Sequence, residues 1–166
     1  GDEGRLMSET EALYSEFWEI FRESIEPDDL HLSRSFRTVH RNLGYIEFPK
    51  LFGESFRLRG TLSVQSGAKN LLNGTRIRAE FKTGCKLGVA FVRDGLGDGH
   101  HETLNGSIAR WQVTTDADAK IELEWQGADL RNRAFWPAHQ LWLRSALHEL
   151  ADTYENEVLR YEDLHA

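Results

Sequence analysis

The sequence predicts an α+β domain in which a curved antiparallel meander sheet of about six strands lies between an N-terminal helix and a long C-terminal helix. Apolar residues recur at helical spacing near both ends of the chain and alternate with polar residues through its middle. Short turns join the alternating runs. Because parallel strands need long crossover connections, these turns favour antiparallel pairing. Both helices are expected to pack their apolar faces on the sheet.

The first helix is expected from residue 9 to residue 24. Residues 8–11 (SETE) have the form of a capping box, in which the Ser and Glu side chains satisfy free backbone amides. Apolar residues follow at helical spacing, and Pro27 with two aspartates ends the run. Residues 1–8 are expected to be a tag or a disordered start, and residues 9–166 to form one domain.

The strands are predicted from runs with a period of two. They are residues 56–64, 76–82, 109–113 and 121–125. Residues 87–92 are apolar almost throughout, which predicts a further, central strand. Residues 35–40 and 45–48 form two weaker runs, whose place relative to the main sheet is left open.

The last helix is expected to begin near Pro137, a residue that suits the first helical turn. An apolar stripe runs from Leu143 to Tyr161, and neither Gly nor Pro interrupts the chain as far as Leu164. The order of elements is loosely similar to the helix-grip fold of lipid- and polyketide-binding proteins. It also resembles pleckstrin-like barrels with a C-terminal helix. The similarity is one of element order, and no family follows from it.

Composition limits the possible classes of protein. Apolar residues make up 40% of the chain and the formal net charge is −7, which indicates a soluble globular protein and argues against non-specific nucleic-acid binding. No apolar stretch is long enough to span a membrane, and no signal-peptide pattern is present. The single cysteine excludes an intramolecular disulfide and favours the cytoplasm. Arginine outnumbers lysine, which suggests a bacterial origin.

The leading functional hypothesis is non-catalytic binding of an apolar or amphipathic molecule between the curved sheet and the last helix. Large aromatic residues on the predicted apolar faces can line such a pocket. These residues are Trp111, Trp125, Trp142, Phe81, Phe91 and Tyr154. The alternative is that they only fill the core.

A second hypothesis is an interaction module that binds an acidic protein partner or an anionic ligand. Residues 31–93 carry twelve Lys and Arg against three Asp and Glu, whereas both ends of the chain are acidic. Strand alternation places four arginines on one sheet face, where guanidinium groups can bind carboxylate or phosphate. These are Arg57, Arg59, Arg76 and Arg78. The alternative is that these arginines pair with the acidic terminal helices or simply keep a sheet edge soluble. Aromatic residues are not interleaved with them, so single-stranded nucleic acid is not expected.

A third hypothesis is a metal-dependent enzyme that uses His100, His101 and Glu102. Residues 94–102 combine glycines with imidazole and carboxylate groups, which are ligands of Zn, Fe or Mn. The alternative is a solvated hairpin loop. No pattern predicts an organic cofactor, and Cys85 is expected in a tight turn between strands.

Overall fold

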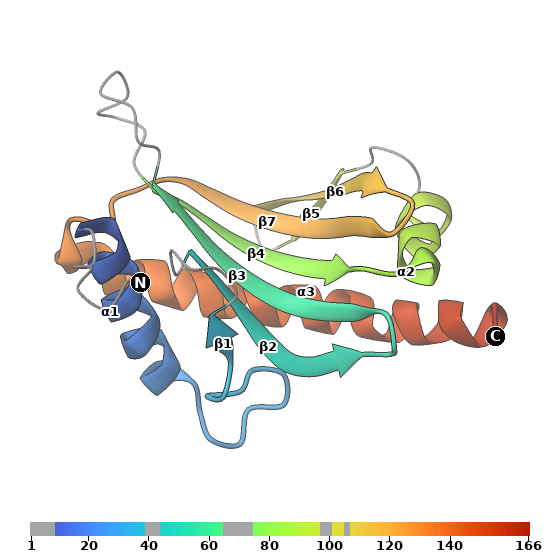
Figure 1. Cartoon of the computed structure of the whole chain (residues 1–166), viewed down its shortest axis with the longest axis horizontal. Coiled ribbons are helices and arrows are strands. Elements are labelled where there is room, and N and C mark those ends of the chain that lie inside the picture. The colour runs from blue at the N-terminus through green and yellow to red at the C-terminus, as the bar shows by residue number, and fades with distance from the viewer. Residues whose placement is uncertain (1–8, 39–43, 65–74, 97–100, 105–106) are drawn as a thin grey trace, which may run out of the picture.

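The computed structural model describes residues 9–38, 44–64, 75–96, 101–104 and 107–166, with the side chains of residues 64, 75 and 101–104 excepted. Its elements are α1 (Glu9–Ser24), β1 (Arg37–Thr38), β2 (Tyr45–Phe52), β3 (Phe56–Val64), β4 (Thr75–Thr83), α2 (Lys86–Ala90), η1 (Phe91–Gly95), β5 (His101–Leu104), β6 (Ser107–Thr115), β7 (Asp118–Ala128), η2 (Arg133–Phe135) and α3 (Trp136–Leu164) (Figure 1). Residues 1–8, including the serine of the predicted capping box, lie outside the described residues.

The predicted antiparallel sheet with a helix at each end of the chain is confirmed. All neighbouring strands are antiparallel, and their order across the sheet is β1-β2-β3-β4-β7-β6-β5. The sheet is open, with β1 at one edge and β5 at the other. The two weak runs before residue 50 therefore belong to the main sheet, as β1 and β2.

The meander comes in two parts. Strands β1 to β4 follow one another across the sheet, after which α2 and η1 carry the chain to the far edge. Strands β5 to β7 then return, so that the last strand lies beside β4. Figure 1 shows α2 at the end of the sheet where β4 finishes and β7 starts.

The prediction of a strand at residues 87–92 is wrong, because this segment forms α2 and the π-helical turn η1. The Sγ atom of Cys85 accepts a hydrogen bond from the backbone N–H of Gly88 at 3.4 Å and caps the first turn. A short apolar run suits a buried helix as well as a buried strand. The buried residues Gly88, Phe91 and Val92 follow the helical spacing.

Both long helices pack against the inner face of the sheet. In α1, Leu13, Phe17 and Phe21 are buried at helical spacing, and α3 runs beneath the sheet along most of its length (Figure 1). Alternate strand residues and these helices form a continuous core. Its largest fully buried side chains include Trp18, Tyr154, Phe17, Phe21, Phe48, Phe52, Phe56 and Phe81.

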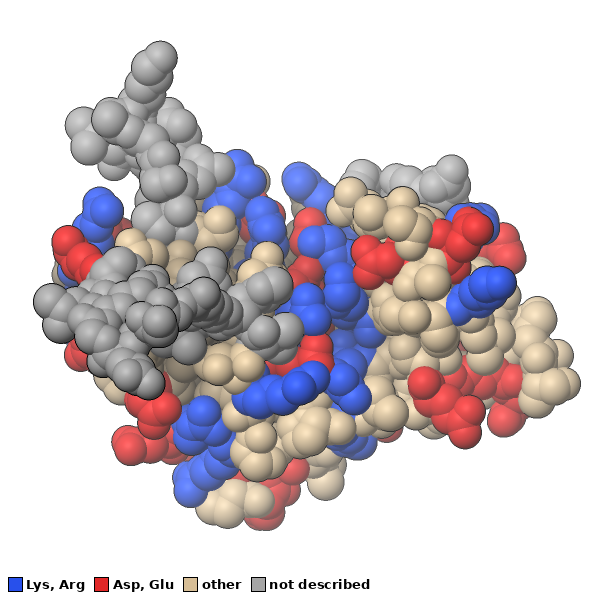
Figure 2. Space-filling view, viewed as in Figure 1, with Lys and Arg blue, Asp and Glu red and all other residues tan. Residues whose placement is uncertain are grey.

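The outer face of the sheet carries the other half of the strand residues, most of which are charged or polar, with Tyr45, Leu51 and Ile108 among the exceptions. No described helix is both long and apolar enough to cross a membrane. On this outer face, cationic side chains form a band across the middle of the molecule, interrupted by a few carboxylates (Figure 2). Antiparallel sheets commonly expose one face in this way.

Candidate functional site

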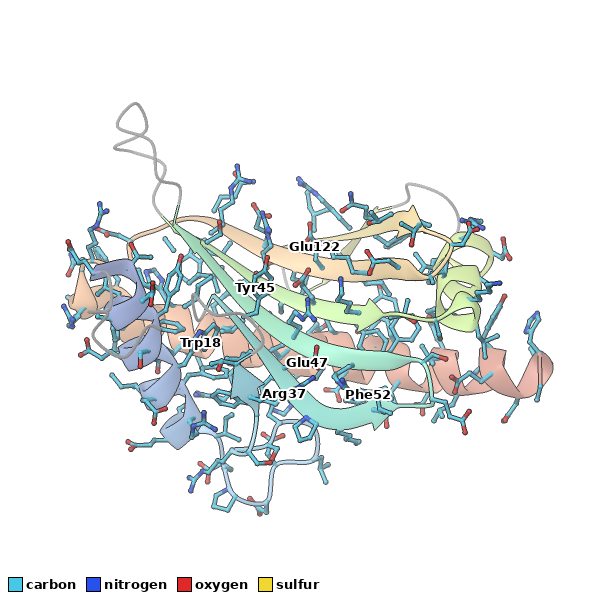
Figure 3. The ribbon with its side chains drawn as sticks, viewed as in Figure 1. Trp18, Arg37, Tyr45, Glu47, Phe52 and Glu122 are labelled. Carbon is cyan, nitrogen blue, oxygen red and sulfur yellow. The ribbon has the colours of Figure 1, made fainter. Side chains whose placement is uncertain are left out.

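Three arginines on the outer face surround one carboxylate, and we call Arg37, Arg57, Arg59 and Glu47 the Glu47 cluster. Arg37 Nη2 and Arg57 Nη1 donate to Oε1 of Glu47 at 3.0 and 2.7 Å, and Arg59 Nη2 donates to Oε2 at 2.9 Å. Figure 3 labels Arg37 and Glu47 on their neighbouring strands. The register explains this geometry, since Glu47 on β2 pairs with Arg37 on β1 and with Arg59 on β3.

The charge state of the Glu47 cluster follows from its contacts. Burial alone would raise the pKa of Glu47, but hydrogen bonds from Arg59, Arg37 and Arg57 outweigh it and lower the pKa to about 2. The carboxylate is therefore ionised at neutral pH, and three guanidinium groups share its single charge. The Nε atoms of Arg57 and Arg59 are buried without an acceptor among the described residues.

The other two predicted arginines are neutralised in a similar way. Arg78 Nε donates to Glu124 Oε2 at 2.8 Å, and Arg76 Nε lies 3.7 Å from Oε1 of the same carboxylate. Burial would raise the pKa of Glu124, but its hydrogen bond from Arg78 and the nearby positive charges lower it below its usual value. The expected pairing of these arginines with the terminal helices is therefore wrong, because their partners are two carboxylates of the sheet itself, Glu47 and Glu124.

Cations also occupy neighbouring positions across the strands. Arg57 pairs in register with Lys82, and Lys82 pairs with Lys120, so three cations stand in one row over β3, β4 and β7. Like charges directly opposite each other are destabilising. Neighbouring carboxylates offset this repulsion, since Lys82 contacts Asp118 at 3.1 Å and Lys120 contacts Glu80 at 2.8 Å.

The described outer face keeps a positive surplus of three. Eight cations point outward from the strands, namely Arg37, Arg57, Arg59, Arg76, Arg78, Lys82, Arg110 and Lys120. Five carboxylates accompany them, namely Glu47, Glu80, Glu122, Glu124 and Asp118. Because the whole chain has a net charge of −7, the charge is segregated between the sheet face and the rest of the protein.

A separate candidate site is an open hollow of about 480 Å³ between η1, β6 and the last two turns of α3, which we call the aromatic cleft. Its lining residues are Phe91, Gly95, Leu96, Trp111, Glu157, Arg160, Tyr161 and Leu164. The rings of Phe91 and Tyr161 meet edge to face with centroids 5.5 Å apart. Burial, together with the negative charge of Asp94, raises the pKa of Tyr161.

The six aromatic residues predicted to line a pocket separate into three pairs. Phe91 and Trp111 line the aromatic cleft. Phe81 and Tyr154 are fully buried and stack at 6.3 Å between centroids in the core, and Trp125 meets Trp142 edge to face at 5.7 Å, where both are partly buried.

Other hollows among the described residues include an apolar groove and a smaller hollow on the outer face. A mainly apolar groove of about 460 Å³ lies between α1 and the start of α3, and we call it the α1–α3 groove. Its lining residues include Ile20, Trp136, Leu141 and Arg144. A smaller hollow of about 350 Å³ lies on the outer face over β6 and β7, where Arg110 stands beside Glu122 and Glu124.

The residues predicted to bind a metal lie where the structure gives no side-chain geometry. His100 is outside the described residues, and His101 and Glu102 are described only as backbone of β5. Within the described part of the chain, His, Cys, Asp and Glu residues form no group of three or more that is arranged to hold a metal ion. The metal hypothesis stays a prediction.

Sequence reasoning missed several residues of both candidate sites. Arg37 lies on a strand of two residues, and Glu47 lies on a strand with a weak alternation, so the local pattern does not predict that either residue belongs to a charged site. Leu96 follows η1, whereas Arg160 and Tyr161 belong to the end of α3, and the three side chains line the same hollow. The available signal was the apolar stripe of α3, which continues to Tyr161.

Comparison with protein-family models, with curated proteins and with solved structures gave no significant match.

Proposed function

We propose that this protein is a non-catalytic binding domain for a small amphipathic molecule, which it holds in the aromatic cleft between the sheet and the C-terminal helix. The observation that carries the proposal is the meeting of three aromatic rings from three elements around one open hollow. Phe91 comes from η1, Trp111 from β6 and Tyr161 from α3. Aromatic walls of this kind favour a ligand with an apolar body.

The size and the rim of the aromatic cleft define the ligand further. Its volume of about 480 Å³ is within the usual range of small-molecule sites. Arg160 and Glu157 lie at the polar side of the lining. Arg160 is exposed, and its guanidinium is suited to a carboxylate or a similar anionic end group. A ligand with an apolar chain or ring and one acidic end matches both the aromatic lining and the guanidinium of Arg160.

The α1–α3 groove is the competing location, because it has a similar volume and a more apolar lining. It lies between two helices and does not contact the sheet. Each hollow contains one tryptophan, Trp111 in the aromatic cleft and Trp136 in the α1–α3 groove. Their indole N–H groups can therefore report separately on the two hollows.

The test is a nuclear magnetic resonance titration of the ¹⁵N-labelled protein with decanoate, and with decanol as the uncharged probe. We expect a saturable shift of the Trp111 indole signal, larger with decanoate, while the Trp136 signal stays in place. A saturable shift at Trp136 alone would assign binding to the α1–α3 groove and contradict the proposal. The absence of any saturable shift with both probes would also contradict it. Trp→Phe variants assign the signals.

A matched pair of variants on α3 provides the second test. Leu164 lines the aromatic cleft and is 74% exposed, whereas Leu159 is 41% exposed and lies outside it. We expect Leu164→Glu to weaken decanoate binding at least tenfold, because it places a carboxylate beside the apolar chain. Leu159→Glu adds the same charge to the same helix and is expected to leave the affinity within about twofold. Equal effects of the two variants would count against the aromatic cleft.

A further inference from the structure

We infer that the Glu47 cluster and the adjoining row of Arg57, Lys82 and Lys120, which we call the cation row, form a docking site for an acidic segment of another protein. The inference is independent of the aromatic cleft, which lies elsewhere on the molecule. It starts from the unequal sharing in the Glu47 cluster, where three guanidinium groups have one carboxylate between them. Each guanidinium has five N–H donors, so most of this donor capacity is not used by Glu47.

The exposure of the three arginines shows which of them a partner can reach. The Arg37 side chain is 71% exposed, that of Arg57 35% and that of Arg59 15%, while Glu47 is 10% exposed. Glu47 therefore lies beneath its arginines and orients them from below. A fixed guanidinium loses less conformational entropy when it binds a carboxylate, which favours binding.

The cation row extends the site across three strands. Arg57, Lys82 and Lys120 stand side by side in register, and neighbouring strands are about 4.8 Å apart. A single small anion cannot contact the whole row. An extended chain with several carboxylates can, because its acidic side chains are distributed over a comparable length.

Two observations favour a protein segment over a nucleic acid. Base stacking needs exposed aromatic rings among the cations, and the described outer face has only Tyr45, whose ring lies under Arg59 at 5.5 Å from the guanidinium carbon. The net charge of −7 also repels a long polyphosphate beyond the site itself. A short acidic peptide contacts only the outer face, so its attraction depends on the local surplus of positive charge there and not on the net charge of the protein.

The test measures the fluorescence anisotropy of a labelled peptide of ten glutamates, with a ten-nucleotide oligo-dT as the second probe. We expect the peptide to bind at 20 mM salt and to lose at least tenfold in affinity at 300 mM, because exposed charges are screened. We expect the oligonucleotide to bind at least tenfold more weakly than the peptide. The absence of peptide binding at low salt, or equal binding of both probes, would overturn the inference.

Two variants locate the site. Arg37→Glu is expected to weaken peptide binding at least tenfold, whereas Arg131→Glu, an equal change at an exposed residue outside the strands, is expected to change it less than threefold. Equal effects would mean that only the total charge matters and would overturn the inference. The Leu164→Glu variant should retain peptide binding, so that failure of the aromatic cleft and failure of this site are distinguishable.

Glu47→Gln gives a result that a purely structural cluster would not. Removing the central charge leaves three guanidinium groups without their shared anion, so we expect the peptide to bind more tightly even though the protein is less stable. Circular dichroism establishes that the variant is folded at the temperature of the assay. An unchanged or weaker affinity in the folded variant would contradict the docking site.

Discussion

Asp29 and His148 face each other with 2.8 Å between Oδ2 and Nε2, and they hold the segment after α1 against α3. The second oxygen of Asp29 accepts the backbone N–H groups of His31 and Leu32 at 2.9 and 2.8 Å. Beside this pair, His31 contacts Asp152 of α3 at 2.8 Å. Two histidine–aspartate pairs thus connect an irregular segment to the longest helix.

Replacing Asp29 should lower the free energy of unfolding in two steps. Asn keeps an oxygen for the backbone amides but loses the charge beside His148, for an expected loss of about 1 kcal/mol, while Ala loses both, for about 2 kcal/mol. Urea denaturation at pH 7 measures both losses. Asp28→Asn, at the exposed neighbouring residue, is the control and should have little effect.

The effect of Asp29→Asn should depend on pH. Burial would raise the pKa of Asp29, but the backbone amides and His148 outweigh it and lower the pKa below its usual 3.8. The stabilisation by the carboxylate is therefore complete above pH 3.8 and is lost as the pH falls through the lower, folded value. The difference between wild type and Asp29→Asn should shrink toward pH 2. A difference that persists there would contradict the role of the charge.

His139 should make the protein less stable in mild acid. It is buried, and burial lowers its pKa below the usual 6.5, although the contacts with Asp129 act in the opposite direction. Because the unfolded chain takes up the proton at a higher pH, this contribution is complete above pH 6.5 and declines below it. We expect a shallower decline between pH 7 and 5 in His139→Asn. His165→Asn, at an exposed histidine, is the control variant.

Cys85 should react with iodoacetamide at a lower pH than an ordinary thiol. Burial would raise its pKa, but hydrogen bonds from Thr83, Gly88, Ser55 and Leu87 lower it below the usual 9.0. The rate of alkylation reports the thiolate fraction. We expect the midpoint of the pH–rate profile below 9, and a higher midpoint in Thr83→Val. A midpoint that Thr83→Val leaves unchanged would show that the hydroxyl does not stabilise the thiolate.

The close contact between α2 and the end of β4 should make Gly88 sensitive to substitution. A Cβ atom at Gly88 would lie 1.9 Å from Oγ1 of Thr83, whereas one at Gly84 would meet nothing within 4 Å. Gly88→Ala should therefore destabilise the protein by roughly 1–3 kcal/mol, as is usual for overpacking. Gly84→Ala should be nearly neutral. Thermal unfolding of the two variants tests the difference, and equal losses would argue against the packing of α2.

The sequence predicted the regular elements better than the sites. The bounds of α1 agree with the prediction because Leu13, Phe17 and Phe21 keep a strict helical spacing over several turns. The long α3 was predictable for the same reason. Residues 87–92 were misassigned because a run of six apolar residues has no period that separates helix from strand.

The neutralisation of the arginines could not be predicted, because it depends on which strands are neighbours. Glu124 reaches Arg78 only because β7 lies beside β4, and Glu80 reaches Lys120 through the same pairing. Local pattern reveals the face of a side chain but not its partner on a distant strand. Of the three aromatic rings in the aromatic cleft, the sequence predicts pocket-lining positions for Trp111 and Phe91 but not for Tyr161.

The pairing of β4 with β7 has a consequence for how the chain folds. Strands β1 to β4 can form during synthesis, but the free edge of β4 has no partner until α2, η1, β5 and β6 have been made and β7 arrives. Contacts between distant segments form slowly, and an unpaired strand edge is a template for other chains. The pairing at the centre of the native sheet thus becomes possible only once the last strand has been made, and until then the edge of β4 is open to mispairing with other nascent chains.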